Sequence, residues 1–197
     1  GCSGYPVENP LYKQLSSRVE MLSIGDPAET NALEFNDGKM ILSELSTFRK
    51  ITWNYVKSVL GLDLIREKIN ACSVIALVGW CNPDHATDVW RGILEEGMQN
   101  GDRKKLLFFD LADPTKKSRE DLMEVLGVIE GFSDYGPIIL GVNENETMKL
   151  YDIFMDEEGG SGSRHDLESM GSYIFSKLKI DGLLIHPVDR SLLVNQE

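Results

Sequence analysis

The chain has 197 residues, of which 42% are hydrophobic and 26% are charged, which is typical of a globular domain with one sizeable core. Its formal net charge of −12 would repel nucleic acid and anionic membrane surfaces, so neither is expected as a partner. No run of about 18 apolar residues occurs, so no membrane-spanning helix is expected.

The first 70 residues mix extended and helical patterns. Residues 19–25 are predicted to form a strand. Residues 32–35 and 39–42 are predicted to pair as a β-hairpin, because Asn36, Asp37 and Gly38 between them tolerate the positive φ of a tight turn. Helices are predicted at about residues 48–60 and 62–69.

The remainder of the chain alternates apolar runs with amphipathic segments. The runs, each continuous as in a parallel strand covered on both faces, lie at residues 74–79, 106–110, 138–142 and 183–186. Helices are predicted between and around them at residues 84–100, 118–129, 146–155 and 167–178. This order predicts a single α/β domain over residues 1–197, with a doubly wound, mainly parallel sheet, helices on both faces and right-handed crossovers. The Gly/Ser stretch at 159–163 is predicted to be a flexible loop.

The most informative segment is Ile139 to Glu146, where an apolar run ends in Asn-Glu-Asn-Glu. Ligands bind at the carboxyl ends of strands in open α/β sheets. Asn143 and Glu146 are three residues apart, so a turn entering a helix would place both side chains on one side. An amide beside a carboxylate suits phosphate and hydrated magnesium. The alternative is a helix cap, with Asn143 as N-cap and acidic residues in the first turn.

Two other strand ends carry polar candidates. Asp110 ends one apolar run and Asp113 follows in the loop, while Asn82 follows the run at 74–79. Carboxylates at these positions can bind the hydroxyl groups of a polyol or coordinate a metal, and Asn82 could line the same edge. The alternative for the aspartates is turn formation, which Asp-Pro favours. His186 also ends a run, and a lone histidine there is interpreted as a satisfied polar group rather than a base.

The three cysteines, at positions 2, 72 and 81, have neither metal-site spacing nor an obvious disulfide framework, which favours a reducing cytoplasm. The alternative rests on Cys2, which could carry the lipid of an exported lipoprotein.

Taken in order, these pieces resemble the PfkB/ribokinase family of carbohydrate kinases. The matching blocks are SIGDPAETNALEF at 23–35 with DGK at 37–39, GWCNP at 79–83, FDLADP at 109–114 and LGVNENE at 140–146, followed by DGLLIHP at 181–187. The resemblance implies a ribokinase-like fold and phosphoryl transfer from ATP to a sugar or nucleoside hydroxyl. Asn143 and Glu146 match the family's N-x-x-E motif, which serves magnesium and phosphate. By the same resemblance, Asp110, Asp113 and Asn82 are expected on the substrate side, and a homodimer is a further expectation.

The sequence also departs from the family pattern. The sugar-binding glycine pair and the G-x-G-D loop, which carries the aspartate base and the anion hole, do not occur among the 197 residues. The turn usual after the last matching strand reads His186-Pro187-Val188. The expectation is therefore the middle of a kinase whose catalytic base lies outside this chain. The alternative is a non-catalytic nucleotide- or sugar-binding module.

Overall fold

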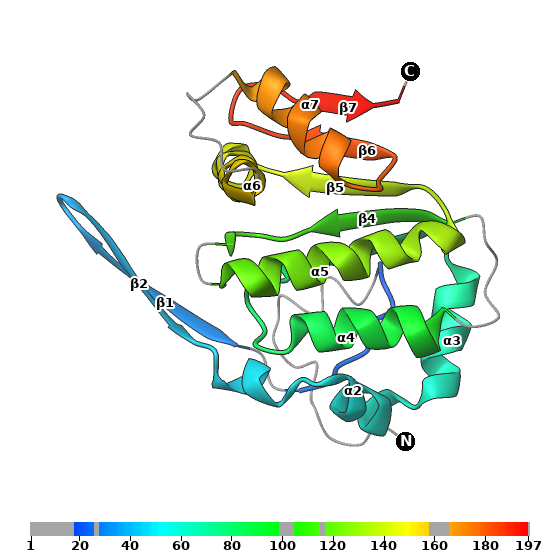
Figure 1. Cartoon of the computed structure of the whole chain (residues 1–197). Coiled ribbons are helices and arrows are strands. Elements are labelled where there is room, and N and C mark those ends of the chain that lie inside the picture. The colour runs from blue at the N-terminus through cyan, green and yellow to red at the C-terminus, as the bar shows by residue number, and fades with distance from the viewer. Residues whose placement is uncertain (1–17, 26–27, 99–104, 115–116, 158–165, 197) are drawn as a thin grey trace.

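The computed structural model describes residues 18–25, 28–98, 105–114, 117–157 and 166–196 (Figure 1). Its centre is a five-stranded sheet in the order β3-β4-β5-β6-β7. The strands are β3 (Val74–Val78), β4 (Leu106–Asp110), β5 (Ile138–Val142), β6 (Gly182–Ile185) and β7 (Leu192–Asn195). The first four are parallel and β7 is antiparallel to β6. The four predicted strands and their parallel arrangement are confirmed, whereas β7 was not predicted.

The helices that connect the parallel strands form one layer against the sheet (Figure 1). They are α4 (Ala86–Gly92), continued by the π-helical turn η2 (Ile93–Gly97), α5 (Arg119–Gly131), α6 (Glu144–Glu157) and α7 (Leu167–Lys177). Because the parallel strands lie side by side in chain order, right-handed crossovers carry every connecting helix to the same face. The α/β class, with a mainly parallel sheet flanked by helices, is confirmed.

The main core lies between this helical layer and the sheet. Leu107, Phe109 and Leu140 point into it and are completely buried. The Phe109 ring packs against Trp90 of α4 at 5.5 Å and against Phe132, just after α5, at 5.2 Å between ring centroids. These aromatic contacts fix α4 and α5 above the centre of the sheet.

The opposite face of the sheet differs from the prediction of cover on both sides. Val74 and Val78 of β3 are 54% and 61% exposed, and Leu193 of β7 is 56% exposed. Among the described residues, no helix that connects two of the sheet strands lies on this side, because the strand order never reverses. The continuous apolar runs therefore predicted the strands correctly but not the present exposure of this face.

The predicted hairpin is confirmed as β1 (Glu29–Phe35) and β2 (Gly38–Glu44), which pair antiparallel. It projects from the rest of the chain (Figure 1), and all its residues are exposed. The reason given for its turn was wrong. Neither Asn36 nor Asp37 has a positive φ, and among the described non-glycine residues only Ala112 does.

Two helices lead from the hairpin into the sheet, α2 (Trp53–Leu60) and α3 (Leu62–Ala71), after the 3-10 turn η1 (Ser46–Lys50). The single helix predicted at 48–60 is divided because Thr52 caps α2, its hydroxyl accepting a hydrogen bond from the Tyr55 amide. Residues 19–25, predicted as a strand, contain no strand. Parts of other predictions, including Cys2 and the 159–163 loop, lie outside the described residues.

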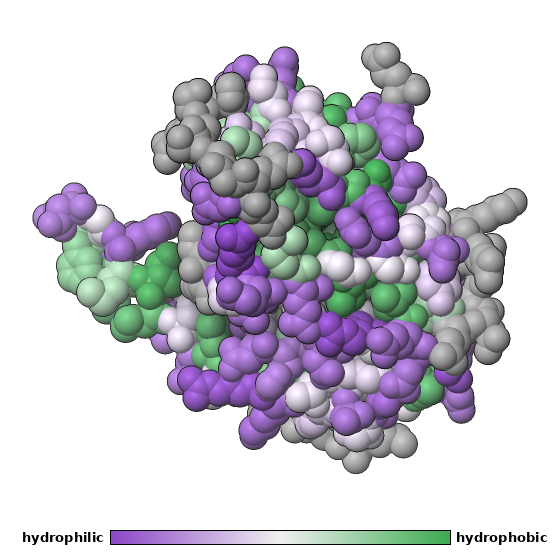
Figure 2. Space-filling view, in the orientation of Figure 1, coloured by the Kyte–Doolittle hydropathy of each residue, from purple (hydrophilic) through white to green (hydrophobic). Residues whose placement is uncertain are grey.

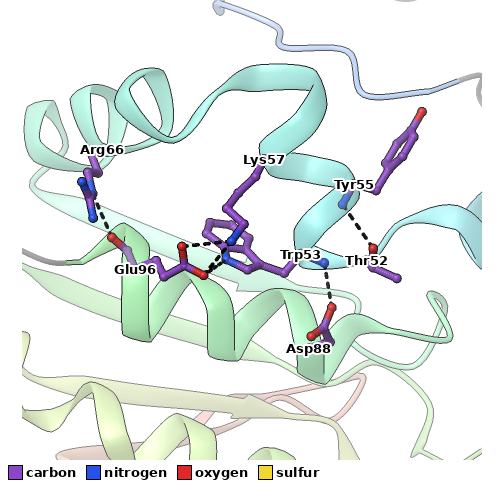
Figure 3. A network of polar contacts seen from close by, with 7 residues as sticks. All are labelled: Thr52, Trp53, Tyr55, Lys57, Arg66, Asp88 and Glu96. Atoms are coloured by element: carbon purple, nitrogen blue, oxygen red, sulfur yellow. Dashed lines mark hydrogen bonds and ion pairs between the residues drawn. The ribbon is translucent and has the colours of Figure 1, made fainter.

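Helix α2 is joined to α4 and η2 by the polar network in Figure 3. The Glu96 carboxylate accepts hydrogen bonds from the Trp53 indole at 2.6 Å and from the Lys57 ammonium at 2.8 Å. Lys57 and Trp53 hydrogen bonding lowers the pKa of Glu96. A Cβ at Gly92 would stand 2.1 Å from the Trp53 ring, so only glycine allows the two helices to approach this closely.

Candidate functional site

The carboxyl ends of the parallel strands bring the predicted site residues to one edge of the sheet. Asp110 ends β4, Asn143 and Glu146 follow β5, and His186 follows β6. Backbone hydrogen bonds connect the neighbouring strand ends at this edge. The Gly79 amide donates to the Asp110 carbonyl and the His186 amide donates to the Val142 carbonyl, both at 2.9 Å. The structure thus places these side chains on adjacent strand ends, in the order expected of a parallel sheet.

Asn143 and Glu146 form a reciprocal cap at the start of α6. The Asn143 side-chain oxygen accepts from the Glu146 amide at 3.0 Å. In return, the Glu146 carboxylate accepts from the Asn143 amide at 2.8 Å and from the Asn143 side-chain nitrogen at 2.6 Å. This is the geometry of a capping box. The capping interpretation is therefore correct as a description of local structure, and any further role must use the remaining lone pairs of the carboxylate.

The environment of Glu146 disfavours its charge. Only 2% of the residue is exposed, and burial raises the pKa of the Glu146 carboxyl above its ordinary value. The carboxylates of Asp110 and Asp113 act in the same direction, whereas the Asn143 backbone hydrogen bond and His186 act against it. A cation brought to this edge would relieve the repulsion among the three carboxylates.

Asp110 is the last residue of β4 and Asp113 lies in the loop after it, and the two differ in exposure. Asp110 is half-buried, and its carboxylate accepts from the Ala112 amide at 2.9 Å, so it does shape the turn as the alternative proposed. Ala112 has a φ of +57°, a conformation that is costly for a residue with a Cβ. Asp113 is exposed. Strained residues of this kind concentrate at functional sites.

Asn82 is the predicted residue farthest along this edge. It is exposed, and its amide closes a turn by donating to the Gly79 carbonyl at 3.2 Å. It belongs to the same rim of strand ends through β3, but none of its described hydrogen bonds reaches the Asn143–Glu146 pair.

These residues suit a hydrated magnesium ion better than a directly bound metal. In the described part of the chain, no three His, Cys, Asp or Glu side chains are grouped to hold a metal ion. Magnesium keeps several of its waters and uses few protein carboxylates. The buried Glu146, the half-buried Asp110 and the exposed Asp113 are the carboxylates at this edge that could support such a hydrated ion.

Sequence reasoning did not single out two lysines at this edge. Lys149 donates to the Pro114 carbonyl and Lys117 to the Pro83 carbonyl, so both tie loops at this edge together. Lys117 also lies 5.4 Å from the centre of the Trp80 ring. His186 is exposed beside the site. The position of Lys149, one helical turn after Glu146, was the available signal.

Cys81 lies under the same loops. It is buried, and burial raises the pKa of its thiol to about 11. The thiol therefore stays protonated near neutral pH, as expected of a core residue rather than a nucleophile.

A hollow of about 180 Å³ lies nearby, between the beginnings of α4 and α5. Trp80, Arg91 and Lys117 are among its lining residues, whereas Asn143 and Glu146 are not. Several of its polar groups are already paired, for example Arg91 with Glu124 at 2.7 Å. The hollow is thus separate from the candidate site.

Comparisons with known proteins agree on the kind of protein. A family model described as prokaryotic ketohexokinase matches residues 1–197. A ketohexokinase from Haloferax volcanii is 25% identical over all 197 residues, which correspond to 51% of its own length. The chain thus spans about half the length of the curated relative that it matches.

A solved structure of adenosine kinase from Schistosoma mansoni, in complex with 2-fluoroadenosine, is similar with a TM-score of 0.55 and 16% identity. The similarity covers 85% of this chain and 45% of that one, and it establishes the fold as ribokinase-like.

Proposed function

The chain belongs to the prokaryotic ketohexokinase family, and on that premise we propose that the full-length protein transfers a phosphoryl group from ATP to a hydroxyl of a ketose sugar. The observation that carries the proposal is the match of the family model over the whole chain, together with Asn143 and Glu146 at the carboxyl edge of a parallel sheet.

Phosphoryl transfer depends on positioning and on charge stabilisation more than on covalent chemistry. Magnesium, when bound with ATP, neutralises charge that develops on the phosphate oxygens. Glu146 would support the hydration shell of that ion, since its carboxylate keeps lone pairs beyond those that Asn143 uses. Asn143 would orient a phosphate or a water through the second hydrogen of its side-chain amide.

We assign the binding of the sugar to the neighbouring strand ends. Asp113 is exposed and Asp110 is half-buried at the end of β4, and Asn82 is exposed after β3. Carboxylate and amide oxygens at such positions can accept hydrogen bonds from sugar hydroxyls. The base that takes the proton of the attacking hydroxyl is proposed to lie outside these 197 residues, since no G-x-G-D string occurs among them.

We further propose a homodimer that forms through the β1–β2 hairpin. A two-stranded hairpin is marginally stable by itself in water. Figure 2 shows hydrophobic side chains gathered along the projecting hairpin, and a second copy offers a self-complementary surface of the same kind.

Since ATP is the proposed donor, the cytoplasm is the proposed compartment. Within the described residues, none of the helices has the length and apolarity needed to cross a bilayer.

The test is ADP formation by purified full-length protein with magnesium and ATP. A ketohexose, an aldohexose and adenosine are supplied in parallel. Preferential turnover of the ketohexose is expected. Equal or exclusive turnover of adenosine would contradict the sugar assignment. Binding of sugar or ATP by calorimetry without turnover would instead support the non-catalytic binding module.

A further inference from the structure

A loop at the candidate site is held in a strained shape by groups from three neighbouring elements. It comprises residues 111–114, directly after β4. Ala112 at its centre has a φ of +57°, and its amide is retained by the Asp110 carboxylate. The Leu111 carbonyl accepts from the Cys81 amide at 3.0 Å. The loop ends at Pro114, which is buried.

The Pro114 carbonyl is the junction between this loop and α6. It accepts one hydrogen bond from the Lys117 amide at 3.1 Å, just beyond the loop, and a second from the Lys149 ammonium of α6. Lys149 is half-buried. A charged donor makes a stronger hydrogen bond than a neutral one, above all where water is partly excluded.

Lys149 lies three residues after Glu146, so both side chains stand on the same side of α6. The first turn of α6 therefore carries the buried Glu146 carboxylate. One turn later, Lys149 contacts the loop that contains Asp113. The negative charge of Asp113 also helps to raise the pKa of the Glu146 carboxyl, so a shift of the loop would change the electrostatic surroundings of that carboxyl. Without the Lys149 contact, a strained loop bearing an exposed aspartate would lose its tie to α6.

We propose that Lys149 is a positioning residue, which latches the 111–114 loop to α6 and so sets Asp113 relative to Glu146 for magnesium-ATP. The inference rests on the proposed function, because the benefit of this arrangement is a kinetic one. Lys149 itself is not expected to touch the substrate.

The test compares Lys149→Met with the wild-type full-length protein. Methionine keeps an unbranched apolar stem but removes the charged donor. Lys149→Arg, which restores a donor, is the rescue variant. Lys179→Met makes the same chemical change at an exposed lysine after α7, near the opposite edge of the sheet, and serves as the matched control.

The first readout is amide hydrogen exchange of Ala112 and Lys117, which is independent of kinase activity. In Lys149→Met these amides should exchange about tenfold faster, as loss of one charge-assisted hydrogen bond implies. Amides of α5 should be unchanged, and Lys149→Arg and Lys179→Met should resemble the wild type. Unchanged exchange of Ala112 and Lys117 in Lys149→Met would overturn the proposal.

The second readout is the magnesium concentration for half-maximal ATP-dependent turnover. It should rise about tenfold in Lys149→Met, by the same energetic argument, with a smaller change in kcat at saturating magnesium and recovery in Lys149→Arg. Faster exchange with an unchanged magnesium requirement would reduce Lys149 to a structural contact and overturn the positioning role. If the wild type shows no turnover, the proposed function fails and with it the positioning role, while the exchange readout still decides whether the latch exists.

Discussion

At the residue scale, Glu146 is subject to two opposing effects on the charge of its carboxyl. Its carboxylate completes the cap of α6 by accepting two hydrogen bonds from Asn143, which favours the charged form. Its burial and the nearby Asp110 and Asp113 favour the neutral form, and burial prevails, so that the pKa is raised. A structural cap gains nothing from this surrounding negative charge, whereas a site for a hydrated cation does.

The raised pKa makes a prediction for the pH dependence of stability. A carboxyl whose pKa is higher in the folded than in the unfolded state binds protons more tightly when folded. Its contribution therefore falls as the pH rises above the ordinary value of 4.5 and through the folded-state pKa. Glu146→Gln removes this titration, so the unfolding free energy of wild type minus variant should decrease with pH across that window.

Urea denaturation of both proteins at a series of pH values between about 4 and 8 measures this difference. A difference that grows with pH would mean that the hydrogen bonds of the cap outweigh burial. That result would remove the electrostatic argument for a cation at this edge.

At the element scale, the hairpin is amphipathic. The register pairs Leu33 with Met40 and Asn31 with Leu42, and because side chains alternate along a strand, one face carries Leu33, Phe35, Met40 and Leu42. The other face carries Ala32 and Ile41 among polar residues. A single apolar face on an exposed hairpin is suited to contact with another protein surface.

If two copies meet through this face, Leu33→Ser should shift the full-length protein from dimer to monomer. Loss of a buried leucine at an interface costs about 2 kcal/mol per copy, and a symmetric contact loses it twice. Ile41→Ser, on the opposite face, is the matched control and should remain dimeric. Sedimentation equilibrium measures both. Dimerisation of Leu33→Ser with wild-type affinity, or a monomeric wild type, would contradict the proposal.

The positions of the helices and strands could be predicted from the sequence better than the contacts between segments that are distant in sequence. The apolar runs and amphipathic segments located the strands and helices within a few residues. The helix predicted at 118–129, for example, has Ser118 as its N-cap, with a capping box to Asp121. The Asn143–Glu146 pair was also found, because both residues are close in sequence. The Lys149 contact with Pro114 was not foreseen, because it joins residues 35 apart that only the fold brings together. The positive φ of Ala112 was not foreseen either, because nothing in the residue type favours that conformation.

At the scale of the whole molecule, the described residues form a sheet that carries a helical layer on one face. One face of the sheet is covered by helices, whereas the other exposes Val74, Val78 and Leu193. Parallel sheets are almost always covered on both faces. The curated relative is about twice as long as this chain, and we expect the remainder of the full-length protein to cover this face and to supply the catalytic base.

The central question is whether the edge that carries Asn143 and Glu146 serves magnesium-ATP in the complete enzyme. The most direct measurement is the magnesium-titrated rate of sugar phosphorylation by full-length wild type and Glu146→Gln, with thermal midpoints recorded in parallel. Gln is nearly isosteric with Glu, so a cap alone predicts a loss of stability of at most about 1 kcal/mol and unchanged kinetics. A role of Glu146 toward magnesium-ATP predicts a rate loss of about tenfold or more and a higher magnesium requirement. A lowered thermal midpoint with wild-type rates would contradict the magnesium role and would leave Asn143 and Glu146 as capping residues.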